Sequence, residues 1–201
     1  MTTSRLLSLA DIADVRAYEA EREKLRDRII ALKQLRRVSL GELVSVVFEN
    51  SETVRFQVQE MARAEGLISD QQIQAELDVY NSLIPAAGEL SATLFLELRS
   101  KAELQHWLPK LVGIEKSIVL RVGEGDNFTE VHSIAEASHE ANLTREDVTA
   151  SVHYVRWQLD AASIDAFATK PVRLLVDHPA YEAEALLGEG TKKSLLGDLT
   201  G

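Results

Sequence analysis

The stretch VSVVFENSETVRFQVQEMARAEG, residues 44–66, predicts a buried β-strand that runs directly into an amphipathic helix. Its first part has the two-residue period of a largely buried strand, with Val44, Val46 and Phe48 alternating with Ser45, Val47 and Glu49. Asn50 or Ser51 is placed to cap the helix, whose core positions recur at helical spacing. Gly66 suits the left-handed position after the helix C-terminus. The rest of the chain is expected to pack around this unit.

A long helix is predicted before this unit, over about residues 8–37. Ser8 with Asp11 resembles a helix start, and Leu7 with Ile12 is spaced as a hydrophobic staple. Several long polar side chains fall on or beside its apolar side: Tyr18, Arg22, Arg26, Lys33 and Arg36. Either the basic side chains lie along apolar surface with their charged ends in water, or these ends point into a shared polar pocket.

The remaining elements predict an α+β protein, with helices in the N-terminal half packed on a mostly antiparallel sheet of about six strands. Ser69 and Gln72 open a further helix, and Ser100 and Glu103 a short one. Strands are expected over 90–98, 117–123, 128–135, 148–159 and, as the last strand, 172–178. Residues 137–147 are expected to form a polar loop. No linker or repeat divides the chain, so we expect a single domain over 1–201.

Composition excludes several kinds of protein. Cysteine is absent, which excludes disulfides, thiolate metal ligands and thiol catalysis. The formal charge of −10 argues against a general affinity for nucleic acid. No apolar run suits a secretory signal or a membrane span, and we therefore expect a cytoplasmic protein without membrane contact.

The familiar chemical motifs are missing, and two histidines remain the most interesting titratable groups. His153 lies in a predicted strand and His178 at the end of another. If these two strands pair, the imidazoles could approach early carboxylates, with Glu60 and Glu65 as the metal-ligand candidates and Glu49 and Glu76 as further ones. Such a set suits iron, manganese or zinc. The same groups also suit a structural polar network with Arg22, Arg36 and Arg156.

Taken together, several segments resemble one bacterial family, known as domain-of-unknown-function family 3501. These segments are YEAEREKLRDRIIALKQLRRVSLG from Tyr18, FENSETVRFQVQEMARAE from Phe48, ELDVYNSLIP from Glu76, ELSATLFLEL from Glu89, LVGIEKSIVLRVG from Leu111, SVHYVRW from Ser151 and VDHPAY from Val176. The resemblance covers nearly the whole chain. It implies a cytoplasmic single-domain protein without an established activity, found in gene neighbourhoods with rubrerythrin-like and iron–sulfur redox proteins. The positions that it falls on are Tyr18, Arg22, Arg36, Arg37, Glu49, Gln57, Glu60, Tyr80, Asn81, Glu97, His153, Arg156 and His178.

Three hypotheses follow, and whether the protein is an enzyme stays open. The first is a non-catalytic binding or accessory protein, a homodimer that works beside redox or iron proteins. The second is a metal-dependent enzyme or sensor that binds a divalent ion through Glu60, Glu65, His153 and His178. The third is a small-anion pocket formed by Arg22, Arg36, Arg37 and Arg156. The candidate polar pocket as a whole comprises Arg22, Arg36, Arg37, Glu49, Gln57, Glu60, Tyr80, Asn81 and Arg156.

The homodimer is suggested by two strands. Residues 90–98 carry apolar side chains on both faces, and Tyr154 and Trp157 lie on opposite faces of 148–159. One face is expected to meet helices, so the other needs cover from a second subunit or from more helices.

Overall fold

The strand–helix unit forms as its sequence predicts. The computed structural model describes residues 6–136 and 147–200, and in it β2 (Val44–Phe48) is buried at every position. It leads into α2 (Ser51–Glu65), where the Asn50 side chain accepts hydrogen bonds from the backbone N–H groups of Glu52 and Thr53. Gly66 ends the helix with a φ of 66°, a conformation that glycine adopts without steric strain.

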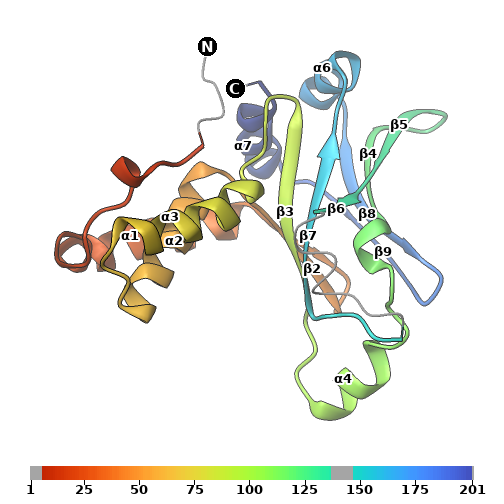
Figure 1. The fold of residues 1–201 in the computed structure, drawn as a ribbon. Coiled ribbons are helices and arrows are strands. Elements are labelled where there is room, and N and C mark those ends of the chain that lie inside the picture. Colours follow the sequence, from red (N-terminus) through yellow and green to blue (C-terminus); the bar gives the residue numbers. More distant parts are fainter. Residues whose placement is uncertain (1–5, 137–146, 201) are drawn as a thin grey trace.

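The other helices and strands are interspersed along the chain (Figure 1). The remaining helices are α1 (Val15–Leu35), α3 (Asp70–Tyr80), α4 (Lys101–Trp107), α6 (Ala161–Thr169) and α7 (Glu189–Thr200), with 3-10 turns η1 (Leu9–Asp11), η2 (Asn81–Leu83) and η3 (Ile114–Lys116). The remaining strands are β1 (Arg37–Leu40), β3 (Glu89–Leu96), β4 (Ile118–Glu124), β5 (Asn127–His132), β6 (Ile134–Ala135), β7 (Val152–Gln158), β8 (Val172–His178) and β9 (Tyr181–Leu186).

The strands form two antiparallel sheets that share one hydrophobic core. The first sheet has the order β1-β2-β3-β7-β6 and the second β5-β4-β8-β9. The core contains side chains from both, among them Leu94 and Trp157 of the first sheet and Leu120 and Leu174 of the second. The sheets meet where Tyr181 of β9 donates a hydrogen bond to the Leu40 carbonyl oxygen over 2.7 Å. The inner face of each sheet is therefore filled by the other.

The outer face of the first sheet is covered by a helical arm, which we define as α1, α2 and α3. Figure 1 shows these helices grouped on one side of the strands. Helices α2 and α3 form the connection between the neighbouring strands β2 and β3, and α1 runs into β1. Since side chains alternate along a strand, Thr93 and Phe95 of β3 point toward the arm while Leu94 points into the core. This arrangement creates an interface between a sheet and helices.

The α+β class is confirmed, but the strands are more numerous than predicted. Among the described residues there are two sheets of five and four strands, where about six strands in one sheet were expected. Residues 37–40 form a strand that was not predicted, and Arg37, the expected end of the first helix, is its first residue. Residues 172–178 are not the last strand, because Pro179 and Ala180 form a turn into β9. The predicted loop lies outside the described residues except for Asp147.

The predicted long helix over 8–37 begins later and ends earlier. Ser8 and Asp11 do form a capping box, but it closes only the turn η1. Ile12 leaves the turn in an extended conformation, and Asp14 caps α1 by accepting hydrogen bonds from two backbone N–H groups. The backbone of Ala13 is bound by the side-chain amide of Gln59, which accepts at 3.0 Å and donates at 2.8 Å. This tertiary contact explains the break, which helical periodicity does not reveal.

No helix within residues 6–136 and 147–200 is long and apolar enough to cross a membrane.

Candidate functional site

The four arginines of the predicted anion pocket lie in four separate ion pairs. Arg22 pairs with Glu60, Arg36 with Asp198, Arg37 with Glu97 and Arg156 with Glu89. Each guanidinium is therefore neutralised by its own carboxylate on a different pair of elements. The structure does not bring these four side chains together, and the geometry does not support an anion pocket built from them.

Glu60 joins α2 to α1. Its Oε1 accepts hydrogen bonds from the Tyr18 hydroxyl at 2.6 Å and from Arg22 Nε at 2.8 Å, while its Oε2 accepts from Arg22 Nη2 at 2.8 Å. The two bonds from Arg22 lower the pKa of Glu60 to about 2, and the Tyr18 bond acts in the same direction. Burial and the Glu60 contact raise the pKa of Tyr18. The three groups serve to hold the arm together.

Arg36 is a structural residue at the junction of the arm, the first sheet and α7. Its side chain is fully buried and donates to the carbonyl oxygens of Phe48 at 2.8 Å and Glu49 at 2.9 Å. It also donates to Ser194 Oγ at 2.9 Å and forms an ion pair with Asp198. Burial raises the pKa of Asp198, against the opposite effect of Arg36. All three guanidinium nitrogens of Arg36 therefore donate hydrogen bonds within the protein.

Asn81 has a similar structural role at the N-terminal segment. Its side-chain amide accepts from the backbone N–H of Leu7 at 2.8 Å and donates to the Leu7 carbonyl at 2.9 Å. Together with the Gln59 contact at Ala13, this bond ties the segment before α1 to the arm.

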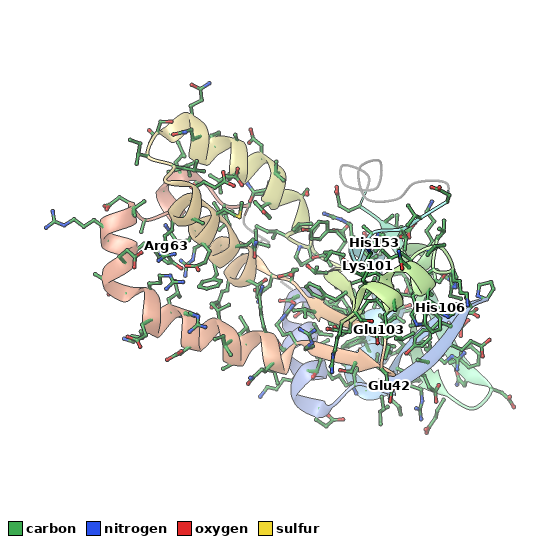
Figure 2. The ribbon with its side chains drawn as sticks, turned by 90° about the horizontal axis from the view of Figure 1, so that it is seen from below. Glu42, Arg63, Lys101, Glu103, His106 and His153 are labelled. Atoms are coloured by element: carbon green, nitrogen blue, oxygen red, sulfur yellow. The ribbon has the colours of Figure 1, made fainter. Side chains whose placement is uncertain are left out.

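The two histidines of the metal hypothesis lie in different sheets. His153 belongs to β7, which pairs with β3 and β6, whereas His178 ends β8, which pairs with β4 and β9. Glu60 is bound to Arg22, and Glu65 is exposed at the end of α2. Figure 2 shows Arg63, which lies between these glutamates on α2, well apart from His153. The strand pairing that this site required does not occur.

Each of these histidines has local partners instead. His178 Nε2 lies 3.1 Å from the Val112 carbonyl oxygen, and its Nδ1 accepts from Ala180 N at 3.2 Å. His153 Nε2 lies 2.9 Å from both Thr149 Oγ1 and the Ala150 carbonyl oxygen. Within the part of the chain that the structure describes, no three His, Asp or Glu side chains are grouped to hold a metal ion.

Glu115 forms a buried acid–base pair with His153 that the sequence does not predict. The Glu115 side chain is 4% exposed, and its Oε2 has no hydrogen-bond partner among the residues that the structure describes. His153 Nδ1 lies 4.0 Å from this oxygen. Burial lowers the pKa of His153, while the negative charge of Glu115 acts in the opposite direction.

A cavity between the helical arm and the first sheet collects three of the predicted pocket residues. We call it the arm–sheet pocket, and its volume is about 150 Å³. Its floor comes from the outer face of the sheet and its walls from all three arm helices and η2. It is lined by Lys33, Glu49, Val54, Gln57, Tyr80, Leu83, Thr93, Phe95, Val152 and Tyr154. Glu49, Gln57 and Tyr80 were predicted for a polar pocket from the sequence.

Glu49 is the most unusual group in the arm–sheet pocket. Its side chain follows β2 and is buried, with the residue only 7% exposed. One carboxylate oxygen accepts from the Thr93 hydroxyl at 2.6 Å and the other from the Thr53 hydroxyl. No cationic side chain among the described residues forms an ion pair with it. Buried carboxylates normally have a cationic or metal partner, because desolvation of an isolated charge is costly.

Two phenols and an amide lie beside this carboxylate. Burial raises the pKa of Tyr80, and nearby Glu76 and Glu65 add to this effect, while its hydrogen bond with Gln57 acts the other way. Burial also raises the pKa of Tyr154, with further contributions from Tyr80 and Glu49. Both phenols are therefore neutral at physiological pH and can donate or accept hydrogen bonds.

Comparison with known families and structures agrees with the resemblance seen in the sequence. The model of the family described as protein of unknown function (DUF3501) matches residues 6–199. The chain belongs to this family. The chain is also similar to a crystal structure titled a novel protein of unknown function from Burkholderia pseudomallei K96243, with 33% sequence identity and a TM-score of 0.87. The match covers 97% of this chain and 100% of that one. A search of curated proteins found no match.

Three polar lining residues of the pocket in this DUF3501 protein were not among the predicted site residues: Lys33, Thr93 and Tyr154. A signal for each was present, because Lys33 lies beside the apolar side of its helix and Thr93 and Tyr154 face away from the core-directed side chains of their strands. The sequence does not show that these faces meet one another across the arm–sheet interface.

Proposed function

We propose that this protein is a non-catalytic, cytoplasmic binding protein that holds a small polar molecule in the arm–sheet pocket. The observation that supports this most is the buried Glu49 carboxylate, which lines a cavity and has only hydroxyl partners among the described residues. A ligand that supplies hydrogen-bond donors or positive charge would satisfy it. Neutral Tyr80 and Tyr154 and the Gln57 amide would orient the same ligand.

The volume limits the size of the ligand. A cavity of about 150 Å³ accommodates a molecule about as large as benzene. Molecules of roughly six to eight non-hydrogen atoms are therefore the class to test. Ligands of this size usually bind in the micromolar to millimolar range.

A screen of small polar molecules by two-dimensional NMR tests the proposal. Binding should shift the signals of Gln57, Tyr80 and Tyr154, and Val152→Phe should abolish the shifts by filling the pocket. A control is Leu175→Phe, which introduces the same phenyl side chain at a partly buried position in the second sheet. Ligands that bind wild type and Val152→Phe equally, or that shift only signals elsewhere, would refute the proposal.

The proposed accessory role toward rubrerythrin-like or iron–sulfur proteins is supported only by the gene context that the family resemblance implies. The test is co-purification of the untagged protein with its genomic neighbours. A neighbouring redox protein that co-elutes with it at stoichiometric amounts would support an accessory role, whereas complete separation at micromolar concentration would contradict it.

The proposed homodimer also awaits its test, and the structure changes the argument for it. Both faces of β3 are covered within the chain, one by the core and one by the arm, and Trp157 is buried in the core. These strands therefore need no second subunit to cover them. Light scattering at several protein concentrations would show the dimer or, by a monomer mass throughout, remove it.

A further inference from the structure

The arm–sheet pocket contains two opposite charges, and neither has an ion-pair partner in the part of the chain that the structure describes. Among the described residues, the Glu49 carboxylate accepts hydrogen bonds only from the Thr53 and Thr93 hydroxyls. The ammonium group of Lys33 on α1 forms no ion pair or hydrogen bond with any residue of the described ranges. By contrast, the nearby Arg36 and Arg37 each form an ion pair with a carboxylate. The lining of the cavity therefore has one cation and one anion that no side chain within residues 6–136 and 147–200 neutralises.

We infer that the pocket binds a small zwitterion, with its ammonium group at Glu49 and its carboxylate at Lys33. This inference rests on the proposed function and specifies the class of ligand. A short amino acid, with the two charges separated by a few carbon atoms, is the chemical class that matches both charges and the volume of about 150 Å³.

The groups around Glu49 suit an ammonium ion. A carboxylate offers about four lone-pair sites, and the two threonine hydroxyls occupy two of them. The neutral phenols of Tyr80 and Tyr154 supply further acceptors, and aromatic faces attract cations. An ammonium group carries three donors, so it can satisfy Glu49 and a phenol together.

The lining of the pocket away from Glu49 suits the carboxylate and the short hydrocarbon part of such a ligand. Lys33 is partly exposed, so its ammonium group can meet a ligand carboxylate that remains in contact with water. Val54, Leu83 and Val152 supply apolar lining between the polar groups. These residues favour methylene groups between the two charges of the ligand over further polar atoms.

Calorimetric titration with matched compounds tests the inference. The set comprises glycine, β-alanine, 4-aminobutyrate and 5-aminopentanoate, which vary the distance between charges, with butylamine and butanoate as analogues that each lack one charge. At least one zwitterion should bind wild type ten times more tightly than the analogues. Lys33→Met should reduce its affinity to that of the amine, and Glu49→Gln should weaken binding of every amine tenfold or more. Lys24→Met, at an exposed position of α1, should change nothing.

The failures of the two proposals are distinguishable. If butylamine binds as tightly as every zwitterion and Lys33→Met has no effect, the ligand is a simple cation and the inference falls, while the binding function stands. If none of these compounds binds but other molecules of the screen occupy the pocket, the inference also falls alone. If no small molecule occupies the pocket, both proposals fail.

One further measurement examines the alternative that Lys33 turns toward Glu49 and serves as its counter-ion in the free protein. In that case Lys33→Met would lower the melting temperature of wild type by several degrees but leave that of Glu49→Gln unchanged. The inference predicts that Lys33→Met changes the melting temperatures of wild type and of Glu49→Gln by the same small amount. A clearly larger decrease in wild type overturns it.

Discussion

Replacing Glu60 with glutamine should destabilise the helical arm at neutral pH but not at acidic pH. The carboxylate of Glu60 accepts three hydrogen bonds from Tyr18 and Arg22, and its pKa is lowered from 4.5 to about 2. A tenfold change in an acid dissociation constant corresponds to about 1.4 kcal/mol, so this difference amounts to about 3 kcal/mol before solvent screening. The Arg22 and Glu60 side chains are 28% and 27% exposed, which reduces the expected value to about 1–2 kcal/mol.

The direction of the pH dependence follows from linkage. Because the pKa is lower in the folded protein, the stabilisation by Glu60 is fully present above about pH 4.5 and is lost as the pH falls from there through about 2. The unfolding free energies of wild type and Glu60→Gln should therefore differ by about 1–2 kcal/mol at pH 7 and converge between pH 4.5 and 2.

Urea denaturation followed by circular dichroism at pH 7, 5, 4, 3 and 2.5 measures this difference. Glu23→Gln, an exposed change on α1, is the matched control and should follow wild type throughout. A difference that is zero at pH 7, or that is as large at pH 2.5 as at pH 7, would refute the assignment of this stability to the ionised carboxylate.

Three further changes test other parts of the structure. Arg36→Met removes a buried cation with partners on β2 and α7, so urea denaturation should show a loss of about 3–5 kcal/mol; a loss below about 1 kcal/mol would contradict its clamping role. Gly41→Ala places a Cβ at a φ of 66° against the Tyr181 phenol, and calorimetry should show a lower melting temperature, with an unchanged value arguing against this contact. Glu115→Gln removes the negative charge that raises the pKa of His153, so NMR titration should show a lower His153 pKa than in wild type. An equal or higher pKa would show that the charge of Glu115 does not act on His153.

The local elements of this protein could be predicted because their signals lie close together in the chain. The strand–helix unit at 44–66, the capping boxes at Ser69 and Ser100 and the strands β4 and β5 all depend on residues a few positions apart. Periodicity and capping are short-range properties, so these predictions were correct.

The break before α1 and the pairing of the strands depend on contacts between residues far apart in the sequence. The start of α1 is set by a side chain 46 positions away, Gln59, which binds the Ala13 backbone. The division of the strands into two sheets separated His153 from His178, although their strand assignments were themselves correct. Periodicity shows which face of a strand is buried but does not show which strand lies beside it.

The candidate site shows the same limit. Residue types and periodicity indicated Glu49 and Gln57 as polar members of the first strand–helix unit, and the family resemblance added Tyr80; all three line the arm–sheet pocket. They could not show that Arg22, Arg36, Arg37 and Arg156 each have a separate carboxylate partner, because ion pairs form between elements far apart in the chain. Packing of the arm on the sheet decided which charges were neutralised and which pair, Lys33 and Glu49, was left to line a cavity.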